Sequence, residues 1–165
     1  MAAKVIFLDI DGVLNSNFWN EDHQREISDG KYIDIEKVKL LSELVKKSGA
    51  SIILHSGWRF WFDEDAQPTR SEAKYLTELL KSEGMIVAGM TPDLTTEEIR
   101  KAKRFSAVKA DEILTWLKDH PETENWVVLD DLELHNEEIA SFQVMTDAEQ
   151  GLTEEDVERA LKMLK

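Results

Sequence analysis

The sequence has no cysteine, no long apolar run and few basic residues. Without cysteine, the chain forms no disulfide bond and offers no thiolate as a nucleophile or metal ligand. No run approaches the roughly 20 apolar residues that a membrane-spanning helix needs. The apolar run near the start is interrupted by Asp9 and is too short for a signal peptide. We therefore expect a soluble protein of the cytoplasm that does not enter a membrane.

Basic residues are outnumbered, with 20 Lys and Arg against 34 Asp and Glu, which gives a net charge of −14. A surface this acidic repels a long polyanion. We therefore expect no binding of extended duplex nucleic acid. The charge does not exclude a small phosphorylated ligand or a strand end held at one local site, and the oligomeric state stays open.

The 165 residues are enough for one domain with a sizeable core. Five short runs are apolar throughout, as is typical of buried parallel strands: residues 4–8, 51–54, 85–88, 126–129 and 142–145. Helical periodicity follows between them, over 35–47, 71–81, 106–119 (capped by Ser106) and from a cap at Thr153 to 164. This alternation predicts an α/β, three-layer, Rossmann-like parallel sheet with helices on both faces. We expect residues 15–33 and 60–70 to be irregular, with no separate cap domain, so that 1–165 form one domain.

Polar residues follow three of the predicted strands. Asp9 and Asp11 end the first strand, Ser56-Gly57-Trp58-Arg59 follows the second, and Asp130-Asp131 ends the fourth. The carboxyl ends of parallel strands meet at one edge of a sheet, where ligands of such folds bind. Carboxylates this close repel one another unless a cation or a proton is present. Mg²⁺ suits this set because it binds carboxylates, waters and phosphate oxygens.

These segments resemble the haloacid dehalogenase (HAD) superfamily of phosphotransferases. F-L-D-I-D-G-V-L matches its first motif, and I-I-L-H-S-G-W-R matches the second through Ser56. Lys109 in F-S-A-V-K-A-D-E-I is the best match to the third, and V-V-L-D-D matches the fourth. A narrower resemblance, which adds E-I-L-T-W-L and a late G-L-T, is to the small HAD domains of multidomain RNA-repair proteins.

The resemblance implies a Mg²⁺-dependent phosphatase with a minimal cap. Asp9 would attack phosphorus and form an aspartyl-phosphate, and Asp11 would act as general acid and then general base. Ser56, Gly57 and Lys109 would bind the phosphate. The expected metal ligands are Asp9, Asp11 (through its main-chain oxygen), Asp130 and Asp131.

Several roles stay open in the sequence. Asp131 is a metal ligand, an acceptor for Lys109 or a cap. The neighbours Lys101, Lys103 and Arg104 compete with Lys109 for the third motif. His55 is read as packed or hydrogen-bonded at its strand end, and Trp58 either belongs to the core or stacks on a base.

The substrate is a phosphorylated small molecule or a nucleic-acid end. Favouring the second, Arg100, Lys101, Lys103, Arg104 and Lys109 form a basic strip in an acidic chain, which Arg59 would join as a substrate-binding residue. The alternative interpretation is that these bases form a solvated helix face and that the protein is a small-metabolite phosphatase. A non-catalytic domain that binds a metal or phosphate is the alternative from another class.

Overall fold

The structure is a computed structural model and describes residues 3–16, 24–28, 31–102 and 105–165. Its centre is a five-stranded sheet in the order β5–β4–β1–β6–β7, and every neighbouring pair is parallel. The strands are β1 (Ala3–Leu8), β4 (Ser51–Leu54), β5 (Val87–Met90), β6 (Thr123–Asp130) and β7 (Gln143–Met145). Because β1 is central, with β4 and β6 on its two sides, the three strand ends that carry polar residues are neighbours. The predicted α/β parallel sheet is confirmed.

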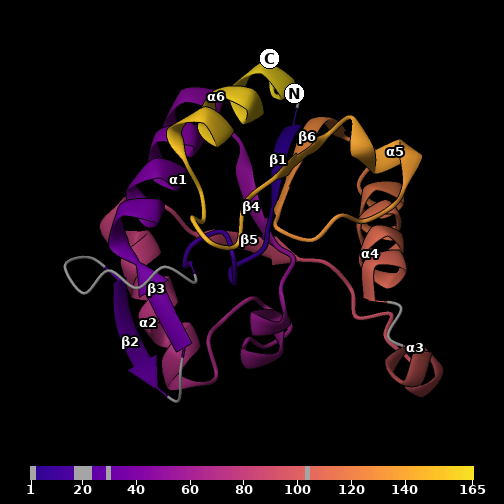
Figure 1. Cartoon of the computed structure of the whole chain (residues 1–165), viewed down its shortest axis with the longest axis horizontal. Coiled ribbons are helices and arrows are strands. Elements are labelled where there is room, and N and C mark those ends of the chain that lie inside the picture. Colours follow the sequence, from indigo (N-terminus) through magenta and orange to yellow (C-terminus); the bar gives the residue numbers. More distant parts are fainter. Residues whose placement is uncertain (1–2, 17–23, 29–30, 103–104) are drawn as a thin grey trace.

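Helices cover both faces of this sheet (Figure 1). One face packs against α1 (Ile35–Ser48), α2 (Ser71–Ser82) and α6 (Glu154–Met163), and the other against α4 (Phe105–Asp119) and α5 (Glu137–Ala140). Neighbouring residues of β1 alternate between the two cores, since Ile6 and Leu8 face the first and Phe7 faces the second. The short α3 (Glu97–Ala102) precedes α4. The result is the predicted three-layer arrangement.

Two helix ends carry caps of the kind that the local sequence favours, and one predicted cap is not observed. Gly49 ends α1 in the left-handed conformation, with φ of 73°, which glycine adopts without the cost of a side chain. Thr153 and Asp156 form a reciprocal capping box at the start of α6. The cap predicted for α4 is wrong, because α4 begins at Phe105 and Ser106 therefore lies inside the helix.

The edge strand β5 begins two residues later than predicted. The backbone N–H of Met85 donates to the Leu80 carbonyl at 2.8 Å, so this residue still closes the end of α2. Pairing with β4 starts only at Val87, opposite Ile52. An apolar run alone does not separate a residue that packs under a helix end from the first residue of a strand.

Part of the stretch predicted to be irregular is a hairpin. Strands β2 (Gln24–Ser28) and β3 (Lys31–Asp34) pair antiparallel between β1 and α1, and residues 17–23 lie outside the described part. The sequence carried a signal for it, since Asp29-Gly30 is a dipeptide typical of two-residue hairpins. The hairpin lies beside α2 (Figure 1). A 3₁₀ helix, η1 (Gly57–Trp61), follows β4 and overlaps the second predicted irregular stretch, 60–70, only at its first two residues.

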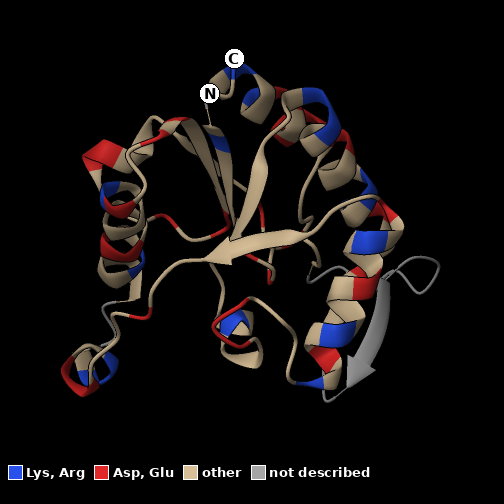
Figure 2. Cartoon of the chain, turned by 180° about the vertical axis from the view of Figure 1, so that it is seen from behind, with Lys and Arg blue, Asp and Glu red and all other residues tan. Residues whose placement is uncertain are grey.

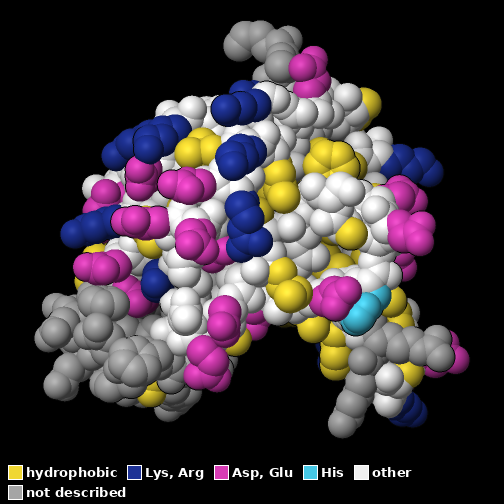
Figure 3. Space-filling view, turned by 45° about the horizontal axis from the view of Figure 1, so that its top comes forward, with side chains coloured by type: hydrophobic (Ala, Val, Ile, Leu, Met, Phe, Trp, Pro, Cys, Tyr) yellow, Lys and Arg dark blue, Asp and Glu magenta, His cyan; other side chains and the backbone are white. Residues whose placement is uncertain are grey.

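The surface reflects the charge of the chain. Acidic and basic side chains are interspersed over the face shown in Figure 3. Within the described residues, no helix combines the length and the apolar character that crossing a membrane requires.

Candidate active site

Asp9 and Asp11 lie where β1 ends and the chain turns. The N–H of Asp9 still pairs with the Leu129 carbonyl of β6 at 3.0 Å, and the Asp9 side chain is buried. Gly12 then takes φ of 86°. A Cβ at Gly12 would overlap the Asp131 carboxylate, so only glycine lets the loop after β1 approach the loop after β6 this closely.

The segment after β7 holds the same turn from another side. Thr146 donates from Oγ1 to the Gly12 carbonyl at 2.7 Å, and Leu152 N–H donates to the Val13 carbonyl at 2.8 Å. At Gly151 a Cβ would lie 2.8 Å from the Asn15 carbonyl oxygen. The backbone that presents Asp9 and Asp11 is therefore fixed by contacts from the ends of β6 and β7.

Three carboxylates converge beside this turn. Asp9, Asp130 and Asp131 each offer an oxygen, and these oxygens all lie within 4.8 Å of one another. Lys109 reaches them from α4, with Nζ 2.7 Å from Asp130 Oδ2 and 3.7 Å from Asp9 Oδ2. Asp130 is fully buried, and its Oδ1 accepts a hydrogen bond from the Leu132 N–H at 2.9 Å.

In this cluster, burial and mutual repulsion disfavour the ionised form of the carboxyl groups. Burial and the neighbouring Asp130 raise the pKa of Asp9 well above its usual range, and Lys109 opposes that shift. Burial and Asp130 also raise the pKa of Asp131. Burial lowers the pKa of Lys109, but Asp9 and Asp130 outweigh it, so the pKa is raised and the ammonium is retained. One ammonium faces three carboxylates, which leaves a negative site suited to a divalent cation.

The Asp11 carboxylate has hydrogen-bond partners outside that cluster. Its Oδ1 accepts from Asn15 Nδ2 at 2.9 Å, and its Oδ2 accepts from Trp58 Nε1 at 3.2 Å. Asn15 also accepts the Gly12 N–H at 2.8 Å and donates to the Tyr32 carbonyl at 2.9 Å. Asp11 remains exposed. Its carboxylate is thus oriented by two donors at an open position beside Asp9, as a group that exchanges protons with substrate and water requires.

Ser56 and Gly57 begin the η1 turn after β4. Ser56 is buried, and its Oγ accepts the Trp58 N–H at 3.2 Å as the N-cap, which leaves the hydroxyl proton for another acceptor. No atom outside its chain neighbours lies within 4 Å of where a Gly57 Cβ would stand. Both residues and Lys109 line one cavity of about 500 Å³, so the structure brings the three predicted phosphate-binding residues together.

Arg59, predicted to bind substrate, is committed to a buried network. Its Nη2 lies 2.6 Å from Glu112 Oε2, and its Nη1 donates to Thr91 Oγ1 at 2.9 Å. His55 Nδ1 lies 2.7 Å from the same Thr91 hydroxyl. Burial, with Lys109 and Arg59 nearby, holds the pKa of His55 well below its usual range, so the ring stays neutral. Arg59 therefore lines the cavity and, through Glu112 and Thr91, links neighbouring segments there.

The predicted basic strip is only partly described. Lys103 and Arg104 lie outside the described residues, and α3 carries acidic as well as basic positions (Figure 2). Arg100 lines the cavity, whereas Lys101 is exposed on α3. Lys109 is the predicted base that contacts the carboxylate cluster.

Sequence reasoning missed Asn15, Thr91 and Glu112. Asn15 follows the aspartate motif directly, and an Asn in a tight loop is a signal for side-chain hydrogen bonding to nearby backbone. Thr91 is a polar residue at a strand end, the position where the other site residues were found. Glu112 gave a weaker signal, since only the fold shows that it faces Arg59.

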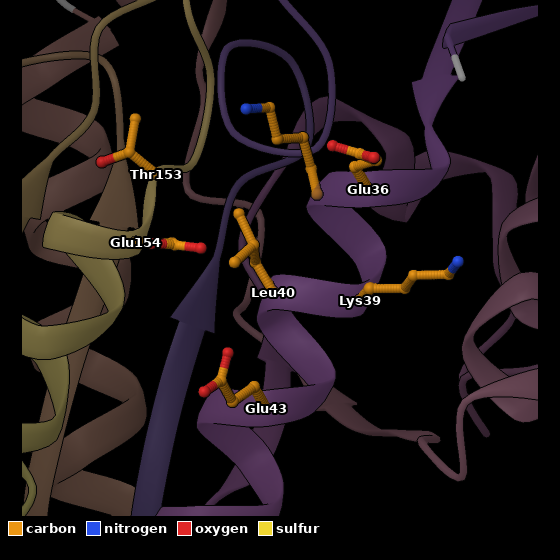
Figure 4. A pocket seen from close by; sticks show the side chains of 7 residues that line it. Glu36, Lys39, Leu40, Glu43, Thr153 and Glu154 are labelled. Atoms are coloured by element: carbon orange, nitrogen blue, oxygen red, sulfur yellow. The ribbon is translucent and has the colours of Figure 1, made fainter. Parts of the chain in front are cut away.

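A second hollow lies between α1 and the start of α6, with a volume of about 430 Å³ (Figure 4). Its lining residues are Glu36, Lys37, Lys39, Leu40, Glu43, Thr153 and Glu154. None of them was predicted to belong to the site, and the charged side chains are of both signs, as on an ordinary solvated surface.

Comparison with known proteins decides the family. The family described as the HAD domain in Swiss Army Knife RNA repair proteins matches residues 5–157. The chain belongs to this family. The match confirms the predicted resemblance and supports a phosphohydrolase at the level of the superfamily. No curated protein and no solved structure matches the chain.

HAD proteins generally use Mg²⁺, and the residues of this HAD domain fit that ion. Carboxylate oxygens are its preferred protein ligands, and Mg²⁺ is usually held by one or two of them with waters and substrate phosphate. Asp9, Asp130 and Asp131 provide such a set in contact with Lys109, one of the residues predicted to bind phosphate.

Proposed function

We propose that this HAD domain is a Mg²⁺-dependent phosphomonoester hydrolase that works through a phosphoryl group carried on Asp9. The observation that carries the proposal is the placement of Asp9. Its carboxylate is buried in the acidic cluster, within 3.7 Å of Lys109, while Ser56 and Gly57 line the cavity that Lys109 also lines. A nucleophile, an acidic cluster suited to a cation and donors for phosphate oxygens thus lie together.

The reaction takes two steps. In the first, an Asp9 carboxylate oxygen attacks phosphorus, the bond from phosphorus to the leaving oxygen breaks, and Asp11 gives that oxygen its proton. In the second, Asp11 takes a proton from water, the water oxygen attacks the same phosphorus, and the bond to Asp9 breaks. Inorganic phosphate leaves, and both aspartates return to their starting protonation states.

Three donors, from α4 and from the start of η1, bind the transferring group. The Lys109 ammonium, the Ser56 hydroxyl and the Gly57 N–H act on the phosphoryl oxygens, where fixed donors stabilise the charge of the transition state. Asp9, Asp130 and Asp131, with the Asp11 main-chain oxygen, would hold Mg²⁺, which would add positive charge near these oxygens. Lys109 also holds the Asp130 carboxylate in place through the 2.7 Å contact.

The proposed substrate is the terminal phosphate of a nucleotide or nucleic acid. The family description, which places such HAD domains in RNA repair proteins, supports this choice over a small metabolite. The cavity supports it as well, because it continues from the phosphate-binding residues to Arg100 and Thr95 and has room for more than phosphate. Such a substrate is consistent with the predicted cytoplasmic location.

The test is release of inorganic phosphate from oligonucleotides that carry a 5′ or a 3′ phosphate. We expect turnover with Mg²⁺, none in excess chelator, and none for Asp9→Asn, because an amide cannot accept the phosphoryl group in this way. Asp111→Asn, the same change at an exposed position of α4, is the control and should match the wild type. Near wild-type turnover by Asp9→Asn would show that the nucleophile is another group.

A further inference from the structure

Two aromatic side chains stand half-exposed beside the phosphate-binding residues. Phe60, from η1, is 54% exposed, and Phe105, at the start of α4, is 46% exposed. Single exposed aromatics are ordinary on protein surfaces. These two, however, come from segments far apart in the sequence and line the same cavity, together with Ser56, Gly57 and Lys109.

The size of this cavity suits one nucleoside. About 500 Å³ falls in the range of small-molecule sites. Its phosphate end is fixed by Ser56, Gly57 and Lys109, so a phosphomonoester bound at Asp9 must direct its leaving group either into this space or out to solvent. The two phenylalanines and Val108 give the space an apolar wall.

The charges of the cavity also favour an anionic ligand with an aromatic part. Arg59, Arg100 and Lys109 line it with one acid, Glu112. Arg59 is paired with Glu112, and Lys109 with Asp130, which does not line the cavity. The Arg59 guanidinium lies 5.3 Å from the centre of the Phe60 ring, a cation–π contact that holds this ring at the cavity. In a chain of net charge −14, the lining of this cavity carries three bases and one acid beside its aromatic rings.

We propose that this cavity is a nucleobase subsite, in which the base of the nucleotide that carries the scissile phosphate stacks on Phe60 and Phe105. The proposal rests on the proposed function and names its substrate class. Stacking on aromatic side chains accepts every base, because each base has a π face. The site therefore selects for the presence of a base at the phosphorylated end and tolerates any sequence there.

The experiment compares oligonucleotides that differ only at the phosphorylated end, where the terminal nucleotide either carries its base or is abasic. Both 5′- and 3′-phosphorylated pairs are used. We expect wild-type kcat/KM to be higher for the base-bearing member by about 5- to 100-fold, the range that base–aromatic stacking supports. Phe60→Leu and Phe105→Leu should each reduce this preference several-fold and leave the abasic substrate unchanged. Both rings are half-exposed, so the leucine variants should fold, which circular dichroism checks.

Phe142→Leu is the matched control. Phe142, directly before β7, is also a partly exposed aromatic residue. It stacks on Trp126 of β6 and does not line the cavity. This variant should keep the full preference for a base. A loss of preference equal to that of the cavity variants would overturn the proposal.

Binding separates this proposal from the proposed function. Calorimetry on Asp9→Asn compares adenosine monophosphate with ribose 5-phosphate, and we expect the nucleotide to bind about 5- to 100-fold more tightly. Absence of turnover for every phosphate, with this difference in binding intact, would reject the hydrolase and retain the nucleobase subsite. Equal affinities, together with equal kcat/KM for base-bearing and abasic ends, would reject the subsite and retain the hydrolase.

Discussion

Replacing Asn15 by Asp tests the claim that Asn15 positions Asp11. The change alters one atom and leaves the size of the side chain the same. Asn15 Nδ2 donates at 2.9 Å both to Asp11 Oδ1 and to the Tyr32 carbonyl, and an ionised Asp has no proton to give to either. The Gly12 N–H keeps its acceptor. Two hydrogen bonds are lost, and a new negative charge faces Asp11.

The magnitude follows from these contacts. An unmet hydrogen bond at the partly buried Tyr32 carbonyl costs about 1 kcal/mol. Two unit charges 2.9 Å apart repel by about 1.4 kcal/mol in water and about 6 kcal/mol at an effective dielectric constant of 20. Asp11 is exposed, so the value nearer to water applies. We expect the free energy of unfolding to fall by about 2–3 kcal/mol.

The effect on catalysis should depend on the leaving group. A displacement of the Asp11 carboxylate by about 1 Å lowers the rate by about 10²-fold. The alcohol leaving group of an oligonucleotide phosphate needs the proton from Asp11, whereas p-nitrophenolate leaves without one. Asn15→Asp should therefore lower kcat/KM for the oligonucleotide about 10²-fold and for p-nitrophenyl phosphate far less.

The assays are urea unfolding and steady-state kinetics on both substrates. Asn136→Asp is the control, because Asn136 caps α5 and Asp serves equally well as an N-cap. If Asn15→Asp matches Asn136→Asp in stability and loses equal activity on both substrates, the positioning role of Asn15 is refuted.

Three further results are expected. The buried His55 has a lowered pKa, so below about pH 6.5 the unfolded state binds a proton that the folded state does not. Between about pH 6.5 and 5.5, the free energy of unfolding measured in urea should fall by up to about 1.4 kcal/mol per pH unit because of this residue. This contribution should be absent in His55→Asn and retained in His135→Asn, which changes an exposed histidine. Gly12→Ala should raise the Mg²⁺ concentration needed for half-maximal activity, because the new Cβ would displace Asp131. Gly84 has a similar positive φ, but no other atom lies near its Cβ position, so Gly84→Ala should lower stability alone. An unchanged Mg²⁺ requirement in Gly12→Ala would contradict the role of Asp131 in the metal site. Ca²⁺ in place of Mg²⁺ should support little phosphate release, since it tolerates looser coordination, and equal rates with both ions would count against the proposed metal site.

The sequence was informative where function depends on strand ends. Continuous apolar runs placed β1, β4 and β6 within a few residues, and parallel order then brought Asp9, Ser56 and Asp130 to one edge. Helix caps at Gly49 and Thr153 were readable because each depends on a few adjacent residues. Such features depend on a few adjacent residues, so the sequence alone can predict them.

Local sequence patterns do not predict contacts between segments that are far apart in the chain. Arg59 and Glu112 are 53 residues apart, and nothing in either segment shows that they pair in the folded chain. For the same reason Lys109 could be preferred to Lys101 only by resemblance, until its contact with Asp130 was seen. The hairpin before α1 was missed although Asp29-Gly30 indicated a turn, because its short strands lack a clear alternation.

The central claim is that Asp9 carries the phosphoryl group, and trapping that group tests it most directly. Asp11→Asn is mixed with Mg²⁺ and p-nitrophenyl phosphate, whose leaving group needs no proton, and the reaction is quenched in acid. Without a general base the second step is slow, so peptide mass spectrometry should find one phosphoryl group on Asp9. A phosphoryl group on any other residue, or rapid turnover by the double variant Asp9→Asn and Asp11→Asn, would contradict the account.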